Sequence, residues 1–147
     1  DGLPHRTKFI REVDGVKYYD DNYSSAPGAA IAAISSFTQT EILIMGGYDK
    51  HVDFAELAAA IKSQTNIRKV ILIGQTRFQI AAALNAVGSG DIYELSDSTV
   101  LRPIVERARA IAKPGDVIIM SPACASFDMF KNFGDRGDQF IEIVESF

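Results

Sequence analysis

Short, uninterrupted runs of apolar residues recur along the chain, and the stretches between them place their apolar residues at a helical spacing. The runs are Ile42–Met45, Val70–Ile73 and Val117–Met120. Runs of this length, with no polar alternation, are typical of strands that are covered on both faces in a parallel sheet. The pattern therefore predicts three central parallel strands.

The stretches between these runs predict amphipathic helices. Two of them begin with the pattern of a capping box, Asp53 with Glu56 and Thr76 with Gln79, and each is followed by an apolar stripe at helical spacing. A third stripe covers residues 100–112 and ends before a Pro-Gly pair. Strands that alternate with helices of this length are typical of an α/β fold.

A hairpin precedes the alternating part. The strand-like segments Lys8–Val13 and Val16–Tyr19 flank Asp14-Gly15, a pair that adopts the positive φ angles of a tight turn. The chain is thus predicted to form a Rossmann-like, doubly wound, mostly parallel sheet preceded by an antiparallel β-hairpin. A length of 147 residues fits one domain, and we expect residues 1–147 to form it.

Composition narrows the range of partners. The chain carries 15 Lys and Arg against 19 Asp and Glu, and this net charge of −4 argues against a non-specific nucleic-acid surface. It has no apolar segment long enough for a membrane span and no signal-peptide pattern, so no membrane partner is expected. A single cysteine and no export signal favour the cytoplasm. Because the chain starts at Asp1 and not at Met, we expect it to be part of a longer protein.

The candidate ligand site lies where the predicted strands end, because doubly wound sheets bind ligands beyond their carboxyl ends. The first run leads into Gly46-Gly47 and then Lys50. The glycines fit either a backbone cradle for an anion or an ordinary turn. Lys50 is the more informative residue, since a lysine about 4 Å from a carboxylate gains on the order of 4 kcal/mol at an effective dielectric near 20, before desolvation is subtracted.

Three other features have competing interpretations. Cys124 follows the last run as a nucleophile would, but no histidine is near it in the sequence, so a small buried residue is the simpler interpretation. Asp20-Asp21 could bind a ribose hydroxyl or a metal-bound phosphate, or could belong to a polar stretch that caps the next helix. The two histidines have no metal-ligand spacing, and no metal site is expected.

Several motifs, taken in order and spacing, resemble the Mur ligase family over the whole chain. The run around Cys124 is the most specific of them. The matching segments are Gly2-Leu-Pro-His-Arg6, Asp14-Gly15-Val16, Tyr19-Asp20-Asp21, Gly46-Gly47 with Asp49-Lys50, Lys113-Pro-Gly-Asp116, Ser121-Pro-Ala-Cys-Ala-Ser126, Asp128-Met-Phe-Lys-Asn-Phe133 and Arg136-Gly137. The chain is most similar to the C-terminal, amino-acid-binding domain of the members that add D-glutamate.

The resemblance implies a cytoplasmic step of peptidoglycan synthesis. ATP would phosphorylate the carboxylate of UDP-N-acetylmuramoyl-L-alanine, and D-glutamate would attack the acyl phosphate. The family's UDP-binding domain and its central domain, which holds ATP and Mg²⁺, have no counterpart in this chain. The isolated domain is therefore expected to hold no cofactor or metal, to contribute no catalytic residue of its own, and to be inactive without the central domain as its partner.

The resemblance also assigns residues. It implies that the carboxylates of D-glutamate are held by a set of hydroxyl, ammonium and backbone groups at Ser25, Lys50, Ser126, Phe127 and Phe133. It places His5, Arg6 and Asp21 beside the ribose and phosphates of the nucleotide.

The loop after the hairpin departs from the family pattern, which reads D-S-K-[AG]-T-N-P. Here the loop is Asp21-Asn22-Tyr23-Ser24-Ser25-Ala26-Pro27, so that Tyr23 stands where a lysine is expected and Ala26 stands where an asparagine would cap a helix. A neutral phenol cannot supply the charge of a lysine. Two alternatives therefore stay open: a related amide ligase with another amino-acid acceptor, and a non-catalytic module that binds a small ligand.

Overall fold

The computed structural model describes residues 5–126 and 128–147, and it places six strands in one sheet. The strands are β1 (Lys8–Val13), β2 (Val16–Asp20), β3 (Glu41–Met45), β4 (Ile67–Leu72), β5 (Tyr93–Leu95) and β6 (Val117–Met120). Their order across the sheet is β1-β2-β6-β3-β4-β5. β1 pairs with β2 in antiparallel fashion, and all the other neighbours pair in parallel.

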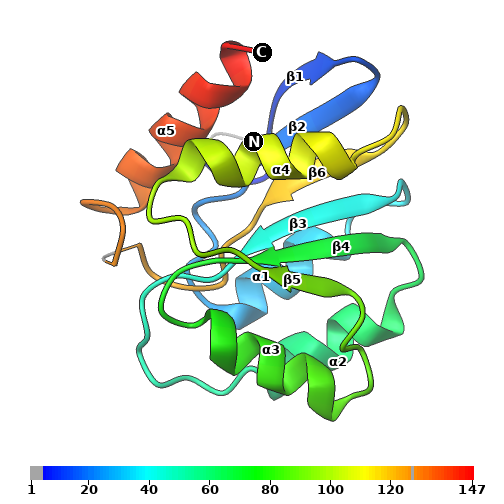
Figure 1. Ribbon diagram of the computed structural model, residues 1–147, viewed down its shortest axis with the longest axis vertical. Coiled ribbons are helices and arrows are strands. Elements are labelled where there is room, and N and C mark those ends of the chain that lie inside the picture. The colour runs from blue at the N-terminus through cyan, green and yellow to red at the C-terminus, as the bar shows by residue number, and fades with distance from the viewer. Residues whose placement is uncertain (1–4, 127) are drawn as a thin grey trace.

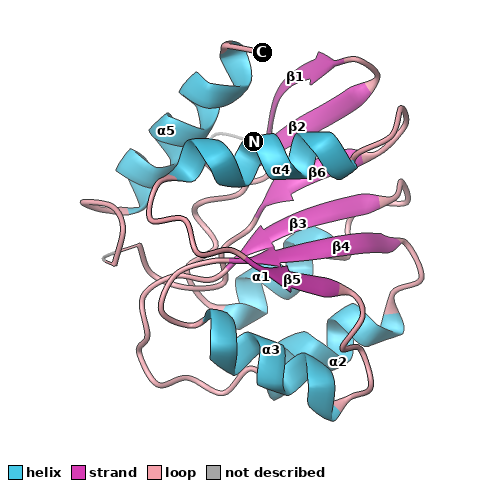
Figure 2. Cartoon of the chain, viewed as in Figure 1, coloured by secondary structure: helices cyan, strands magenta, loops and turns pink. Residues whose placement is uncertain are grey.

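Five helices in the described part of the chain cover the two faces of this sheet. They are α1 (Pro27–Ile34), α2 (Ala55–Ser63), α3 (Arg77–Ala86), α4 (Leu101–Ile111) and α5 (Phe133–Glu145). Figure 1 shows α1, α2 and α3 on one face, with α4 and α5 on the other. After β5 the chain returns through α4 to β6, which lies between β2 and β3 (Figure 2). The predicted doubly wound α/β fold with its leading hairpin is confirmed. None of these helices combines the length and the apolar character needed to cross a membrane.

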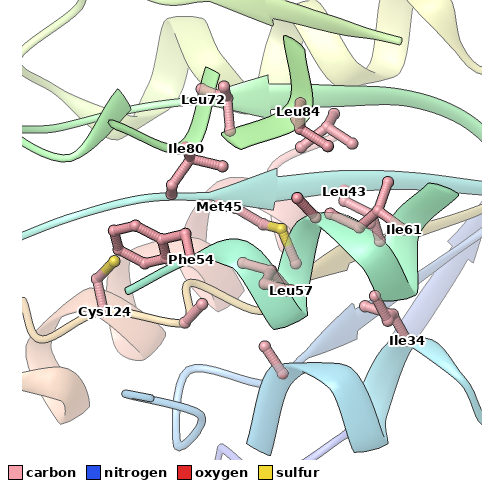
Figure 3. Packing of buried hydrophobic residues seen from close by; sticks show 14 of the residues in the cluster. Ile34, Leu43, Met45, Phe54, Leu57, Ile61, Leu72, Ile80, Leu84 and Cys124 are labelled. Carbon is pink, nitrogen blue, oxygen red and sulfur yellow. The ribbon is translucent and has the colours of Figure 1, made fainter. Parts of the chain in front are cut away.

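Each central strand supplies side chains to two separate cores, because successive residues of a strand point to opposite faces. In β3, Leu43 and Met45 join the core under α1, α2 and α3, whereas Ile42 and Ile44 join the core under α4 and α5. Figure 3 shows Leu43 and Met45 within the first core, and Cys124 at its edge. Burial on both faces explains why these strands read as continuous apolar runs.

The predicted elements differ from the structure mainly at their ends. β4 covers Ile67–Leu72 and not Val70–Ile73, and β2 extends one residue further, to Asp20. β5 was not predicted, because its three residues lie at the edge of the sheet and are only partly buried. α5 was also not predicted.

Both predicted capping boxes are wrong. α2 begins at Ala55, and the Asp53 carboxylate accepts a hydrogen bond from the Ala55 N–H at 2.8 Å without capping the helix. Thr76 does precede α3, but its hydroxyl accepts from the Gly47 N–H at 3.0 Å. At α3, a tertiary contact with the loop after β3 thus takes the place of the local cap.

Candidate functional site

A hollow with one lysine lies beyond the carboxyl ends of β3 and β6, where the strand order of the sheet reverses. Doubly wound sheets bind ligands at such a point. We call it the lysine hollow, and its volume is about 150 Å³. It is lined by Ser25, Lys50, Ala125, Ser126, Asn132 and Phe133.

Four of the five residues that the resemblance assigns to D-glutamate therefore lie around one hollow, although they come from three loops and the start of α5. They are Ser25, Lys50, Ser126 and Phe133. Phe127, the fifth, lies outside the described residues. Asn132 lines the hollow as well and was not assigned a role from the sequence.

The loop that carries Lys50 is held from the side of α3. The Asp49 N–H donates to the Gln75 side chain at 3.0 Å, and the Asp49 carboxylate accepts from Gln79 at 3.0 Å. The same carboxylate accepts from the His51 N–H at 2.7 Å. Contacts on both sides of Lys50 thus fix the backbone from which its exposed side chain extends.

The Gly46-Gly47 pair serves close packing and is not free to cradle an anion. The Gly46 N–H donates to the Pro122 carbonyl at 2.9 Å, and the Gly47 N–H donates to the Thr76 hydroxyl at 3.0 Å. A Cβ at Gly47 would lie well inside van der Waals contact with the Ala125 carbonyl oxygen. The glycines therefore let the loop after β3 pass against the loop after β6, and Lys50 is the group left to meet an anion.

Asn132 and Phe133 reach the lysine hollow because α5 begins there. The Asn132 side chain caps the helix by accepting from the Asp135 N–H at 2.8 Å. The Asp135 carboxylate in turn accepts from the Lys131 N–H at 3.1 Å. This cap holds the first helical residue, Phe133, at the edge of the hollow, where its ring is 40% exposed.

A second and larger hollow of about 390 Å³ lies between α1 and the segment before β1. We call it the arginine hollow, and Arg6, Asp21 and Tyr23 line it together with the hydroxyl residues Thr7, Ser24 and Ser36. Alanines of α1 form the rest of its lining, Ala29, Ala32 and Ala33. Two of the three residues assigned to the nucleotide, Arg6 and Asp21, thus share one hollow with the unusual Tyr23.

Asp21 is committed to the protein itself. Its side chain accepts from the N–H and hydroxyl of Thr7, at 2.9 and 3.0 Å, and from the hydroxyls of Ser24 and Ser121. A carboxylate has about four acceptor positions, and these four donors occupy them. Asp21, which is only 1% exposed, therefore ties the rim of the arginine hollow to the end of β6.

His5 is the assigned nucleotide residue that does not line the arginine hollow. One ring nitrogen bonds the buried carboxylate of Asp20, and the other lies 3.3 Å from the Asp138 carboxylate. A Cβ at Gly137 would overlap the His5 ring, so this glycine makes room for it. Asp20 also accepts from Asn22, and no side chain caps α1. The polar stretch after β2 therefore binds the N-terminal segment and its own loop, and the predicted capping of α1 is wrong.

Arg136 is a buried cation that lies between the loop after β2 and the loop after β6. Sequence reasoning assigned it no role. It is 1% exposed and donates to the Asn22 side chain at 2.7 Å, to the Asn22 carbonyl at 3.1 Å and to the Cys124 carbonyl at 3.0 Å. Burial lowers the pKa of its guanidinium from its ordinary value to about 10, so it stays charged at neutral pH. The sequence signal was available, because Arg136 shares one helical stripe with Phe140, Ile143 and Val144.

Cys124 belongs to the core and is not a nucleophile. Its side chain lies in the core of Figure 3, and its sulfur is 3.3 Å from the Thr76 hydroxyl. Burial raises the pKa of the thiol from 9.0 to about 11, although the hydrogen bond with Thr76 opposes the shift. A thiol of this kind is protonated at neutral pH and therefore unreactive.

A further hollow of about 150 Å³ is bounded by Pro27, Val52 and Cys124 and shares Lys50 with the lysine hollow.

The described residues contain no group of three or more His, Cys, Asp or Glu side chains that could hold a metal ion.

Comparison with known proteins identifies the family. A family model described as "Mur ligase, glutamate ligase domain" matches residues 5–124. The chain belongs to the Mur ligase family. The resemblance inferred from its motifs is confirmed, and the match covers the loops that carry Asp21, Lys50 and Cys124.

Relatives of the Mur ligase family match nearly the whole chain. A UDP-N-acetylmuramoylalanine–D-glutamate ligase of Clostridium perfringens is 46% identical over 147 residues, which cover 99% of this chain and 32% of the relative. An enzyme of the same name from Pseudomonas fluorescens is 45% identical over 148 residues, which cover 98% of this chain and 32% of the relative. The chain thus spans about a third of the length of these relatives.

Solved Mur ligase structures share the fold. A MurF ligase from Thermotoga maritima, solved in complex with ADP, superimposes with a TM-score of 0.64 at 19% identity, covering 98% of this chain and 31% of that one. The murein peptide ligase mpl from Psychrobacter arcticus gives a TM-score of 0.66 at 15% identity, covering 99% of this chain and 30% of that one. At such low identity the likeness shows the fold alone.

Proposed function

We propose that this chain is the C-terminal, amino-acid-binding domain of an ATP-dependent amide ligase that adds D-glutamate to UDP-N-acetylmuramoyl-L-alanine in peptidoglycan synthesis. The observation that carries the proposal is the lysine hollow, in which one ammonium group and two hydroxyl residues lie together at the switch point of the sheet. Relatives at 42–46% identity that bear the name of this ligase support the choice of D-glutamate.

The lysine hollow suits a ligand with two carboxylates. The Lys50 ammonium supplies the positive charge, while the hydroxyls of Ser25 and Ser126 and the amide of Asn132 supply neutral hydrogen-bond donors. Phe133 gives an apolar wall for the methylene groups between the two carboxylates. Held in this way, the amino acid presents its amino group for attack, and positioning of the reactants is the main contribution of this domain.

The arginine hollow suits the phosphates or the ribose of a nucleotide. Arg6 can pair with phosphate oxygens. The hydroxyls of Thr7 and Ser24 donate to Asp21 and that of Ser36 donates to the Ala33 carbonyl, so their oxygens can accept from a ribose hydroxyl. ATP supplies the phosphoryl group that activates the carboxylate of the other substrate as an acyl phosphate. Mg²⁺ would accompany ATP in the complete ligase and, on this proposal, is held outside this domain.

The remaining parts of the proposed ligase lie outside this chain. The central ATPase domain would be the partner against which the two hollows close, and a further domain would bind the UDP group. A pathway that uses ATP and a UDP-linked precursor places the protein in the cytoplasm. On this proposal it has neither a nucleic-acid nor a membrane partner.

Lys50→Ala tests the proposal in the full-length ligase. Removing the ammonium group is expected to raise the KM for D-glutamate about tenfold or more while the KM for ATP changes little, because an ion pair with a carboxylate in a partly enclosed site is worth more than one exposed to water. Release of ADP or phosphate that depends on the amino acid measures both constants. Lys113→Ala, in the turn before β6 at the amino ends of the parallel strands, is the matched control.

The same assay separates the alternatives. Turnover with D-glutamate and an unchanged KM in Lys50→Ala would show that Lys50 does not hold a carboxylate. Tyr23, at a position where the family pattern has lysine, is the observation that favours a different acceptor. Faster turnover with L-glutamate or a neutral amino acid would establish that acceptor, and no turnover with any amino acid would favour a binding module.

A further inference from the structure

Tyr23 lies between the two hollows and contacts residues of both. It lines the arginine hollow, and its ring is 45% exposed. The same ring meets Phe133 edge-on, with centroids 5.6 Å apart and an interplanar angle of 82°. Phe133 in turn lines the lysine hollow. One pair of aromatic rings in edge contact therefore joins the lining of one hollow to the lining of the other.

On its other side, Tyr23 faces Arg6. The guanidinium carbon of Arg6 lies 5.9 Å from the centroid of the Tyr23 ring, within the range of a cation–π interaction. The backbones are also tied together, since the Tyr23 N–H donates to the His5 carbonyl at 2.8 Å and the Thr7 N–H donates to Asp21. Both neighbours of Arg6 are therefore anchored, and the Tyr23 ring orients the exposed arginine side chain between them.

Phe133 is held in the same way from the side of α5. Its ring meets the ring of His5 at 6.2 Å and 88°, so it lies in edge contact with His5 as well as with Tyr23. His5 is itself bonded to the buried Asp20. The series of side-chain contacts from Arg6 through Tyr23 to Phe133 is thus held in place by buried polar groups, and it connects the two hollows directly.

We propose that Tyr23 is a positioning residue that couples the two hollows. Its ring orients the Arg6 guanidinium toward a phosphate-bearing ligand in the arginine hollow, and it supports Phe133 against a dicarboxylic amino acid in the lysine hollow. Binding in one hollow then restricts this pair of rings and favours binding in the other hollow. By thermodynamic linkage, the effect on affinity is the same in both directions. This inference rests on the proposed function for the identity of the two ligands.

The first test compares Tyr23→Leu with the wild type in the full-length ligase. Leucine keeps an apolar side chain but removes the ring, so the KM values for ATP and for D-glutamate are both expected to rise, each about two- to fivefold, with a smaller change in kcat. Tyr23→Phe keeps the ring and is expected to recover most of this loss. Phe78→Leu removes a ring that faces the Arg77 guanidinium at 4.5 Å on α3, away from both hollows, and serves as the matched control.

A double-mutant cycle tests the contact between Arg6 and Tyr23 on which the coupling depends. Arg6→Met and Tyr23→Leu act on the same interaction. The fold increase in the KM for ATP in the double variant is therefore expected to be well below the product of the fold increases in the two single variants. Multiplicative effects of the two substitutions would overturn the inference. A rise in only one of the two KM values in Tyr23→Leu would also overturn it.

A measurement that needs no turnover separates this inference from the proposed function. In the 147-residue chain, the ring current of Tyr23 is expected to shift the NMR signal of the Arg6 side-chain N–H, and Tyr23→Leu is expected to abolish that shift and to move the Phe133 ring signals. Unchanged Arg6 and Phe133 signals would overturn the coupling, whatever the substrate of the enzyme. A full-length protein that shows these shifts but does not use D-glutamate would contradict the proposed function alone.

Discussion

The buried residues around the site form a connected set of hydrogen bonds that fixes the loops. Arg136 donates to Asn22, Asn22 donates to Asp20, and Asp20 bonds His5. Breaking such a set leaves buried groups unpaired, which costs more than the bonds themselves contribute. At the scale of single residues, the exposed Arg6 and Lys50 could be predicted as site residues from their motifs. Arg136, the buried cation that holds the loops around the site in place, became apparent only with the structure.

Glu41 gives a prediction of pH-dependent stability. It is fully buried at the start of β3, where burial raises the pKa of its carboxyl from 4.5 to about 7, and hydrogen bonds from Asn66 and Gln64 oppose this shift. Above pH 7 the folded protein must carry a buried carboxylate, so stability is expected to fall between about pH 4.5 and pH 7, by up to roughly 3 kcal/mol. Chemical denaturation across this pH range measures the effect.

Glu41→Gln is expected to remove this dependence, because the amide keeps one acceptor for Asn66 and Gln64 and has no charge to bury. The free energy of unfolding of the variant minus that of the wild type should therefore be larger at pH 8 than at pH 5. Glu56→Gln, an exposed position on α2, is the control. Equal pH dependence in Glu41→Gln and the wild type would show that Glu41 is not the group responsible.

At the scale of elements, the site depends on how closely the loops after β3 and β6 approach each other. The Tyr48 N–H donates to the Ala125 carbonyl at 2.8 Å, and Tyr48 and Ala125 form an isolated antiparallel bridge. Gly47 permits this approach because it has no side chain on the side of Ala125. A strand-to-helix turn could be inferred from the glycines, but their partner loop lies nearly 80 residues further along the chain and could not.

Two glycine-to-alanine substitutions test this packing. Gly47→Ala would force its Cβ against the Ala125 carbonyl, so we expect a loss of about 2 kcal/mol or more in the free energy of unfolding. Gly28→Ala, in α1, has no heavy atom within 4 Å of the new Cβ and is expected to stabilise by about 0.5–1 kcal/mol. Urea denaturation of both variants measures the difference, and a neutral Gly47→Ala would show that the loops can separate at little cost.

At the scale of the whole molecule, both hollows open at the surface of the chain and neither has a group that could activate a carboxylate. The described residues offer a lysine in one hollow and an arginine in the other, and no cluster that could hold a metal ion. Positioning groups of this kind act when a second domain closes over the ligands. On the proposed function, the groups that transfer the phosphoryl group would therefore be supplied by another domain.

The purified 147-residue chain is accordingly expected to show neither ligase nor ATPase activity, even at saturating ATP and D-glutamate. Phosphate release measures ATP hydrolysis, and mass spectrometry of the product measures amide formation. Addition of the rest of the ligase as a separate polypeptide should restore turnover if the two parts associate. Amide formation by the chain alone, above a Lys50→Ala control, would contradict this expectation.

The sequence by itself determined the layers of the fold and the family, because both depend on local signals. Apolar runs between helical stripes mark buried parallel strands, and contiguous motifs such as the one from Ser121 to Ser126 carry the family likeness. Only the tertiary structure decided how the loops meet. It buried Arg136 beneath them, gave every acceptor position of Asp21 to the protein itself, and set Tyr23 between the two hollows. These outcomes depend on contacts between residues up to about 110 positions apart, which no local pattern encodes.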